Sequence, residues 1–338
     1  MLGSDHKSKF FILFLAVLGA ILLNLSFGSI HIPFQQTIKA LFGQPLENNS
    51  WEYIIYNYRL PKTIAGFLIG GGLALSGLLM QTLFRNPLAG PFVLGISSGA
   101  SLGAALLLMG SSLTGFLFLS DISLVTAASL GSFLVLLVVL VVANNIRDTM
   151  ALLIIGLMFG SITSAIVSVL AYFSNAEQLQ RFIFWSYGSV GDLSWIQNGI
   201  LASIVLLGLV LSVFSIKALN ALLLGENYAR SLGVQLKRSK FIIIVATGLL
   251  AGCITALAGP IAFVGLAVPH LTRMLFNTMN HKILVPAVFL SGTILMLICD
   301  TIAQVPFSAK VLPINAITSL VGAPVVIWLL IKKRKMLF

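Results

Sequence analysis

Ionisable side chains inside long apolar stretches are the first candidates for chemistry in this chain. Asp300 is the one acidic residue in such a stretch, and an intramembrane carboxylate costs about 2.5–3.5 kcal/mol on insertion scales. It predicts either a group that carries a proton or an ion, or a helix-end carboxylate paired with neighbouring backbone or hydroxyl groups such as Thr301. The second interpretation is favoured. His270, beside Pro269 in another apolar stretch, is interpreted as a hydrogen-bonded structural histidine.

The chain lacks the patterns of several common catalytic and metal sites. It contains no Gly-x-x-x-x-Gly-Lys-[Ser/Thr] loop and no Gly-Lys dipeptide, so it cannot hydrolyse ATP by the mechanism of that loop. It also has no His-x-x-x-His or Cys-x-x-Cys pair, and Cys253 and Cys299 both lie in apolar stretches. The sequence therefore predicts no metal, no cofactor and no enzymatic activity in this chain.

The composition of the chain indicates which kind of secondary structure holds these residues. Of 338 residues, 58% are hydrophobic and only 9% are charged, whereas soluble domains average about 25% charged. The apolar runs, such as Phe10–Leu25, are continuous, which excludes the alternating pattern of a membrane barrel. The sequence predicts an all-α polytopic membrane protein. The run at Phe10–Leu25 is interpreted as a retained first helix, because no clean signal-peptide cleavage site follows it.

About 20 apolar residues are needed for one helical crossing, and the pattern predicts about ten crossings in a single transmembrane domain, residues 1–338. The expected spans are residues 10–28, 62–84, 92–110, 122–143, 149–173, 195–215, 240–258, 261–277, 284–304 and 312–331.

The basic residues orient these spans. With a cytoplasmic N-terminus, 15 of the 20 Lys and Arg residues lie on the cytoplasmic side and 5 lie outside. The positive-inside rule therefore predicts that both termini are cytoplasmic. The net charge of +11 reflects this orientation in a bilayer, and no nucleic-acid partner is expected because the cations are scattered.

Glycines recur one helical turn apart in several spans. This spacing lets helix backbones approach closely, and packing within the chain is favoured over a pore or dimer seam. The spaced glycines are Gly66 and Gly70; Gly95, Gly99 and Gly103; Gly156 and Gly160; and Gly248 and Gly252.

A cytoplasmic segment, residues 217–240, is the longest polar stretch on that side. Short helix-forming runs are interrupted there at Gly225 and Gly233, and Glu226 and Arg230 are spaced to support one helical turn. Two short helices with a glycine bend would suit docking into a partner's groove. An ordinary amphipathic loop is the alternative.

An ordered set of motifs from about residue 55 to the C-terminus resembles the permease subunits of ABC importers for ferric siderophores, haem and cobalamin. The motifs are Arg59-Leu-Pro-Lys62, Met80-Gln81 through Arg85-Asn-Pro-Leu-Ala-Gly-Pro91 to Ala100, Leu224-Gly-Glu226 through Ala229-Arg-Ser-Leu-Gly-Val234, Gly259-Pro-Ile261 through Pro269-His270 to Arg273, and Leu320-x-Gly-Ala-Pro324 before Trp328.

The resemblance implies a multi-pass subunit in the bacterial inner or cytoplasmic membrane, expected to act as a homodimer or as a close heterodimer. It also implies two ATP-binding subunits, which would carry ATP and Mg, and an extracytoplasmic substrate-binding protein. By the match, the residues that couple to the ATPase are Gly225, Glu226, Ala229, Arg230, Leu232 and Gly233. Those at the cytoplasmic gate are Asn86, Leu88, Thr149 and Met150, and those that dock the binding protein are Arg59, Lys62 and Lys310.

Three positions depart from the family pattern. Gln304 stands where an Arg is common, Val311 where a Glu is common, and Asn315 where a Gly is common. Lys310 is the candidate to replace the missing basic docking contact.

Three alternatives stay open at this point. The expected cargo is a ferric siderophore, then haem, then cobalamin. An ion-coupled secondary transporter would need a buried ion-binding cluster, for which only Asp300 is a candidate. An intramembrane enzyme would need a His/Asp/Glu constellation that the sequence does not offer.

Overall fold

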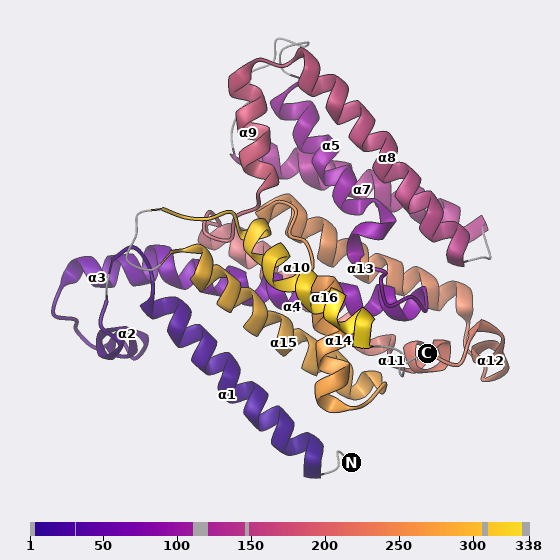
Figure 1. The fold of residues 1–338 in the computed structure, drawn as a ribbon, viewed down its shortest axis with the longest axis horizontal. Coiled ribbons are helices and arrows are strands. Elements are labelled where there is room, and N and C mark those ends of the chain that lie inside the picture. The colour runs from indigo at the N-terminus through magenta and orange to yellow at the C-terminus, as the bar shows by residue number, and fades with distance from the viewer. Residues whose placement is uncertain (1–3, 31, 111–120, 146–148, 306–309, 333–338) are drawn as a thin grey trace.

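The chain folds into helices in every part that the computed structural model describes, residues 4–30, 32–110, 121–145, 149–305 and 310–332. The long helices form a bundle, and shorter ones join them at its two ends (Figure 1). In chain order the helices are α1 Ser4–Ser26, α2 Phe34–Leu41, α3 Asn49–Ile54, α4 Leu60–Leu83, α5 Ile96–Leu108, α7 Asp121–Asn145, α8 Thr149–Phe173, α9 Ala176–Ser186, α10 Trp195–Phe214, α11 Ile216–Leu222, α12 Glu226–Ser231, α13 Leu236–Ala258, α14 Val264–Phe276, α15 His281–Ala303 and α16 Ile314–Lys332.

Each of the ten expected spans overlaps a helix, which confirms the polytopic all-α prediction. Among the described residues, seven helical segments are long and apolar enough to cross a membrane, and α5, α14 and α16 are shorter apolar helices. At about 1.5 Å per residue, the 13 residues of α5 and of α14 reach only about two thirds of a hydrocarbon core about 30 Å thick.

The predicted start is wrong for two of the expected spans, residues 92–110 and 261–277. Residues 92–110 were expected to form one helix, but a 3₁₀ turn, η2 (Pro91–Leu94), comes first, and Gly95 then turns the chain at φ 73° before α5 begins. Residues 261–277 begin as irregular backbone, and α14 starts only after Phe263, whose φ is 66°. Non-helical backbone at this depth is tolerated where it is buried in protein, and Leu94 and Ile261 are both buried.

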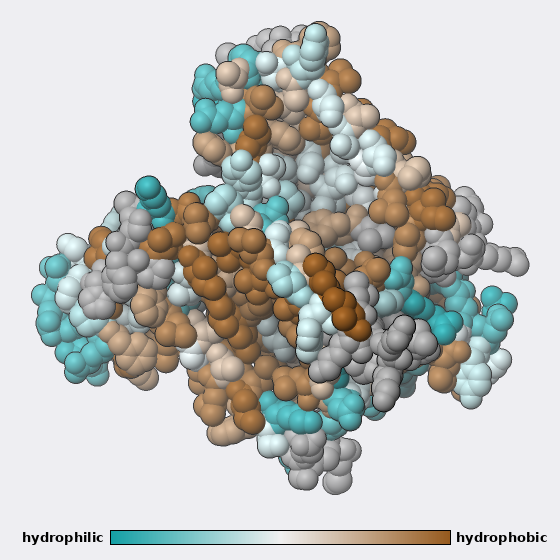
Figure 2. All heavy atoms as spheres, in the orientation of Figure 1, coloured by the Kyte–Doolittle hydropathy of each residue, from teal (hydrophilic) through white to brown (hydrophobic). Residues whose placement is uncertain are grey.

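The bundle has hydrophilic residues at both ends and hydrophobic residues between them (Figure 2). The start of α1, the C-terminal end of α16 and the short helices α11 and α12 lie toward one end, whereas α2 and α3 lie at the opposite end (Figure 1). Hydrophobic residues cover the middle of the molecule, and hydrophilic ones gather around α12 and around α2–α3 (Figure 2). The start of α1 and the C-terminal end of α16 thus lie on the side of α12 (Figure 1), the cytoplasmic side predicted from charge.

Helix α4 lies at the centre of the bundle and packs against α10, α13, α14 and α15. Its backbone comes very close to two of them. A Cβ atom added at Gly77 would overlap the carbonyl oxygen of Gly265 in α14, and Gly70 and Gly292 of α15 stand in the same relation. Gly99 of α5 and Gly131 of α7 form a similar contact. These glycines serve packing within the chain, as small residues do where helices associate in lipid.

Gly77→Ala should lower the stability of the bundle by about 1–3 kcal/mol, because the new methyl group has no room beside the Gly265 carbonyl. The measurement is the thermal unfolding midpoint of the detergent-solubilised chain. Gly19→Ala is the matched control, since nothing lies within 4 Å of a Cβ there. Equal midpoints for the two variants would contradict the close contact.

Candidate functional site

The cytoplasmic segment folds into two short helices, α11 and α12, before the chain enters α13. Gly225 precedes α12 at φ 101°, and Gly233 follows it at φ 79°. At the second position the Val234 N–H donates to the Ala229 carbonyl (3.1 Å) and the Gly233 N–H donates to the Arg230 carbonyl (3.0 Å). This is a Schellman motif, which needs a left-handed residue and so favours glycine. The predicted glycine bends are confirmed.

One side of this segment packs on the bundle, and large apolar side chains are exposed among the polar residues of the other side. Ala229 is fully buried. Leu224, Tyr228 and Leu232 are spaced four residues apart and are 62%, 54% and 58% exposed. Tyr228 lies in α12 and Leu232 ends it, so these two share a helix face, whereas Leu224 lies just before the turn at Gly225. The exposed Arg230 is also in α12. Sequence reasoning found Leu232 among these exposed residues and missed Leu224 and Tyr228.

Glu226 is held by a lysine from the next helix. Its carboxylate oxygen lies 2.8 Å from the Lys240 ammonium of α13, and both side chains are mostly shielded from solvent. Sequence reasoning expected Glu226 to support its own helix through Arg230. The ion pair with Lys240 instead joins the start of α12 to α13, because the turn at Gly233 folds the chain back.

A polar chain joins α11 to the cytoplasmic end of α4. Asn220 of α11 accepts the His281 N–H at 2.9 Å and lies 2.8 Å from the Nδ1 atom of that residue. The His281 Nε2 atom lies 2.8 Å from the Thr82 hydroxyl of α4. His281 and Thr82 are fully buried. This connection was not predicted, because its three residues lie far apart in the sequence.

The loop after α4 holds two of the predicted gate residues, Asn86 and Leu88. The Asn86 side-chain oxygen accepts the Leu88 N–H (2.9 Å), which fixes a tight turn, and Leu88 is 49% exposed. The Pro87 carbonyl lies 2.8 Å from His270 Nε2, which confirms the structural interpretation of His270. Arg85 precedes the turn, and its guanidinium would lie 3.4 Å from a Cβ at Gly225. The loop therefore adjoins the cytoplasmic segment.

Arg273 braces the same loop from α14. It donates to the Gln81 side-chain oxygen at 2.8 Å, and the Gln81 amide donates to the Leu266 carbonyl at 3.1 Å. The Asn86 N–H donates to the Gln81 carbonyl at 3.1 Å. The other predicted gate residues, Thr149 and Met150, open α8, and their side chains lie outside the described residues.

The three predicted docking residues sit differently at the external end of the bundle. Arg59 is only 7% exposed and donates to the carbonyls of Leu25 (2.7 Å), Ser26 (2.8 Å) and Ile30. It thereby satisfies carbonyls at the end of α1. Lys62 is paired within the chain, and Lys310 is exposed. Docking by these residues stays a prediction, with Lys310 the most accessible of them.

Asp300 belongs to a buried network among α1, α4 and α15. Its carboxylate lies 3.2 Å from the Lys62 ammonium and accepts hydrogen bonds from the amides of Asn24 (2.8 Å) and Gln304 (2.9 Å). Asn24 also donates to the Thr301 hydroxyl at 3.1 Å. The paired, structural interpretation is confirmed, but Lys62, Asn24 and Gln304 are the direct partners. No cluster of three or more metal-ligating side chains occurs among the described residues.

Two of the departures from the family pattern now have a structural setting. Gln304 uses its amide to bind Asp300. Asn315 accepts the Ala262 N–H at 3.0 Å with its side chain, and its own N–H donates to the Tyr187 carbonyl at 3.2 Å. Asn315 therefore satisfies irregular backbone before α14 that a glycine could not reach. Val311 is 70% exposed, and nothing in the structure explains its substitution.

Asp300→Ala should destabilise the bundle by about 3 kcal/mol, because it leaves Lys62 without its anion and removes the acceptor for two amides. Lys62→Met added to Asp300→Ala should restore part of the loss, as a double-mutant cycle of unfolding midpoints would measure. Additive losses in the double variant would contradict a direct Lys62–Asp300 coupling.

Comparison with known proteins agrees with this geometry. The sequence model of the FecCD transport family matches residues 14–332. The vitamin B12 import system permease protein BtuC of Citrobacter koseri is 38% identical over 286 residues, 84% of either chain. BtuC of Salmonella typhimurium is 37% identical over 286 residues, 84% of this chain and 85% of the relative.

Solved structures share the fold. An inward-facing transporter assigned to the metal-chelate ABC type has a TM-score of 0.83 and 32% identity, covering 95% of this chain and 98% of the other. PsaBC from Streptococcus pneumoniae, in complex with Fab, has a TM-score of 0.56 at 16% identity, covering 80% of this chain and 90% of that one; it supports the fold alone.

The family match covers nearly the whole bundle, and the curated relatives are named as permease proteins. With its apolar spans, the chain is a multi-pass protein of the inner or cytoplasmic membrane. It belongs to the FecCD transport family and is the permease subunit of an ABC importer.

Proposed function

We propose that this permease imports a metal chelate as a homodimer, driven by two separate ATP-binding subunits and supplied by an extracytoplasmic binding protein. The observation that carries the proposal is the exposure of Leu224, Tyr228 and Leu232 on and beside α12 of the cytoplasmic segment. Apolar side chains exposed on a short helix and at its ends can bind in a partner's groove. ATP and Mg belong to the partner subunits, because no phosphate-binding loop occurs in this chain.

The contacts around the segment supply a path for movement. When the ATPase closes on ATP, it would displace α12, and the Glu226–Lys240 pair would carry that displacement to α13. The Asn220–His281–Thr82 chain would carry it to the end of α4, where the gate loop begins. The bundle is then the two-state element, and ATP changes the populations of its inward- and outward-open forms.

Charge reversal at Glu226 or at Arg230 should weaken ATPase binding and lower stimulated ATP turnover at least tenfold. The variants are Glu226→Lys and Arg230→Glu, measured by co-purification of the ATPase and by ATP turnover in proteoliposomes. Wild-type turnover and uptake in both variants would show that the segment does not couple. The folding control is the unfolding midpoint of the permease alone, which should change little for the exposed Arg230.

The exchanged pair Glu226→Lys with Lys240→Glu separates two roles of Glu226. If Glu226 acts by holding α12 on α13, the exchange restores the ion pair and most of the ATP turnover. If Glu226 contacts the ATPase directly, turnover stays low although the permease is folded.

The relatives' names bear on the cargo. A ferric siderophore was the first expectation from the sequence, but the curated relatives at 37–38% identity are named for vitamin B12 import. We therefore place cobalamin ahead of a ferric siderophore and haem. All three are metal chelates, the class in which the solved relative at 32% identity is placed.

The test is uptake into proteoliposomes that contain the permease, its co-purifying ATPase and the cognate binding protein. Radiolabelled cobalamin, a ferric hydroxamate siderophore and haem are compared with and without internal ATP. ATP-dependent cobalamin uptake supports cobalamin as the cargo. Uptake of the ferric hydroxamate alone would instead identify a ferric siderophore as the cargo. Uptake without ATP and without a partner subunit would overturn the ATP-driven mechanism and favour an ion-coupled secondary transporter.

A further inference from the structure

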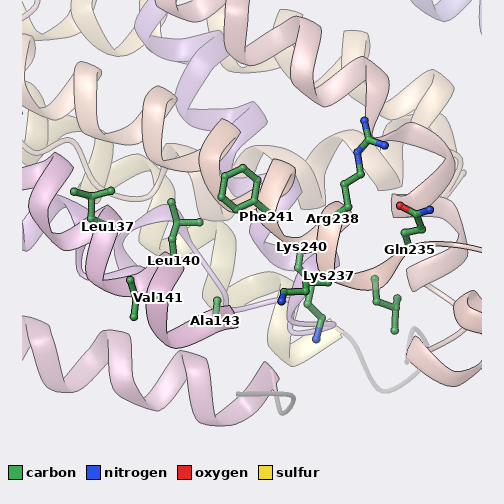
Figure 3. A pocket seen from close by; sticks show the side chains of 10 residues that line it. Leu137, Leu140, Val141, Ala143, Gln235, Lys237, Arg238, Lys240 and Phe241 are labelled. Carbon is green, nitrogen blue, oxygen red and sulfur yellow. The ribbon is translucent and has the colours of Figure 1, made fainter. Parts of the chain in front are cut away.

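A cavity of about 870 Å³ lies where the cytoplasmic end of α7 passes the first turns of α13. The α7 side is apolar and is formed by Leu137, Leu140 and Val141 (Figure 3). The α13 side carries Lys237 and the other basic residues of the helix start. We call this feature the α7–α13 groove. It combines an apolar wall with a basic rim.

We propose that the α7–α13 groove binds an anionic phospholipid of the cytoplasmic leaflet. The acyl chain lies against Leu137, Leu140 and Val141, and the headgroup phosphate is held by Lys237 and Arg238. This lipid site goes beyond the proposed transport function, and its test does not depend on transport.

The depth of the two walls fits one lipid molecule. Helix α13 begins at Leu236, so Lys237 and Arg238 lie at its cytoplasmic start, where headgroups are found. Leu137 lies eight residues before Asn145, the cytoplasmic end of α7, which is about 12 Å along the helix axis. A phospholipid carries its charge at the membrane surface and its chain directly below, as the groove requires.

The positive charge of the basic rim, formed by Lys237 and Arg238, also favours binding of an anion. The first turn of α13 contains no acidic residue, and its N-cap Gln235 makes no side-chain capping bond. The start of a helix carries partial positive charge, and added cations there repel one another unless an anion is present. Lys240 has Glu226 as a counter-ion. Lys237 and Arg238 are exposed, and no acidic partner is found for them among the described residues.

Figure 3 shows how these cations are arranged. Lys237 extends toward the α7 side near Ala143, whereas Arg238 extends to the other side of α13. Both residues line the cavity but extend to different sides of α13, so a headgroup held by both would lie across the helix start. The rim also adjoins the cytoplasmic segment, because Lys240 holds Glu226 of α12.

A second cavity provides an internal contrast. It has a volume of about 550 Å³ and lies between α7, α10 and α13, lined by residues such as Phe133, Ile200 and Leu249 and by no Lys or Arg. Such a cavity can take an acyl chain but has no group that selects a headgroup. The basic rim thus distinguishes the α7–α13 groove.

The experiment compares retained lipid in the wild-type protein and in the double variant Lys237→Gln with Arg238→Gln. Each protein, with any co-purifying subunits, is equilibrated with mixed phosphatidylglycerol and phosphatidylcholine vesicles, re-extracted and analysed by native mass spectrometry. The wild type should retain phosphatidylglycerol preferentially. The preference should fall about 30-fold in the double variant, about fivefold for each cation near an anionic surface.

Lys282→Gln is the matched control, because it removes one exposed cation from the cytoplasmic start of α15, outside the groove. It should leave the preference unchanged, and an equal loss in this variant would overturn a specific site.

Val141→Trp tests the apolar wall without changing charge. Val141 is 63% exposed, so the indole can occupy the groove without disturbing the bundle, and retained phosphatidylglycerol should fall while the protein's size in solution stays the same. Unchanged lipid preference in both the Trp variant and the double variant would overturn the proposal. Loss of the ATPase, or dissociation of a dimer, with lipid retention intact would assign the groove to a protein partner instead.

Discussion

Close contact between helix backbones around α4 is the constraint on which the rest of this structure depends. In a bilayer the hydrophobic effect does not drive helices together, so van der Waals packing must do so. Gly77 and Gly70 bring α4 against the backbones of α14 and α15. Because little side-chain volume lies between these backbones to absorb a shift, a displacement at the cytoplasmic end of α4 must move whole helices. That rigidity is what a permease driven from one end requires.

The spans and their orientation could be predicted because they follow from quantities that add along the chain, the apolar content and the number of cations. The breaks before α5 and α14 could not. Hydropathy is continuous through residues 91–95 and 259–263, and it does not reveal that Gly95 and Phe263 adopt left-handed backbone. Those conformations are set by neighbours that approach from other parts of the chain, as Asn315 does at Ala262.

The candidate site divides in the same way. Local spacing predicted the two short helices and the bends at Gly225 and Gly233. It gave Glu226 its partner within one helix, whereas the structure pairs it with Lys240 through the turn at Gly233. The resemblance placed Arg59 and Lys62 at a docking surface, but it could not show that α1 ends against Arg59 or that Asp300 faces Lys62. Contacts between residues that are distant in sequence can be identified only once the fold is known.

The junction between α3 and α4 has a consequence for how this chain can vary in length. Residues Ile55–Arg59 form a π-helix, η1, directly before Pro61, which has no N–H to donate to the preceding turn. A π-turn holds one residue more than an α-turn. Deleting a single residue there would leave a continuous α-helix but rotate α2 and α3 by about 100° relative to α4. The packing of α2 against the end of α1 would then be lost. The external end should therefore tolerate insertions between α2 and α3 far better than a one-residue loss at this junction.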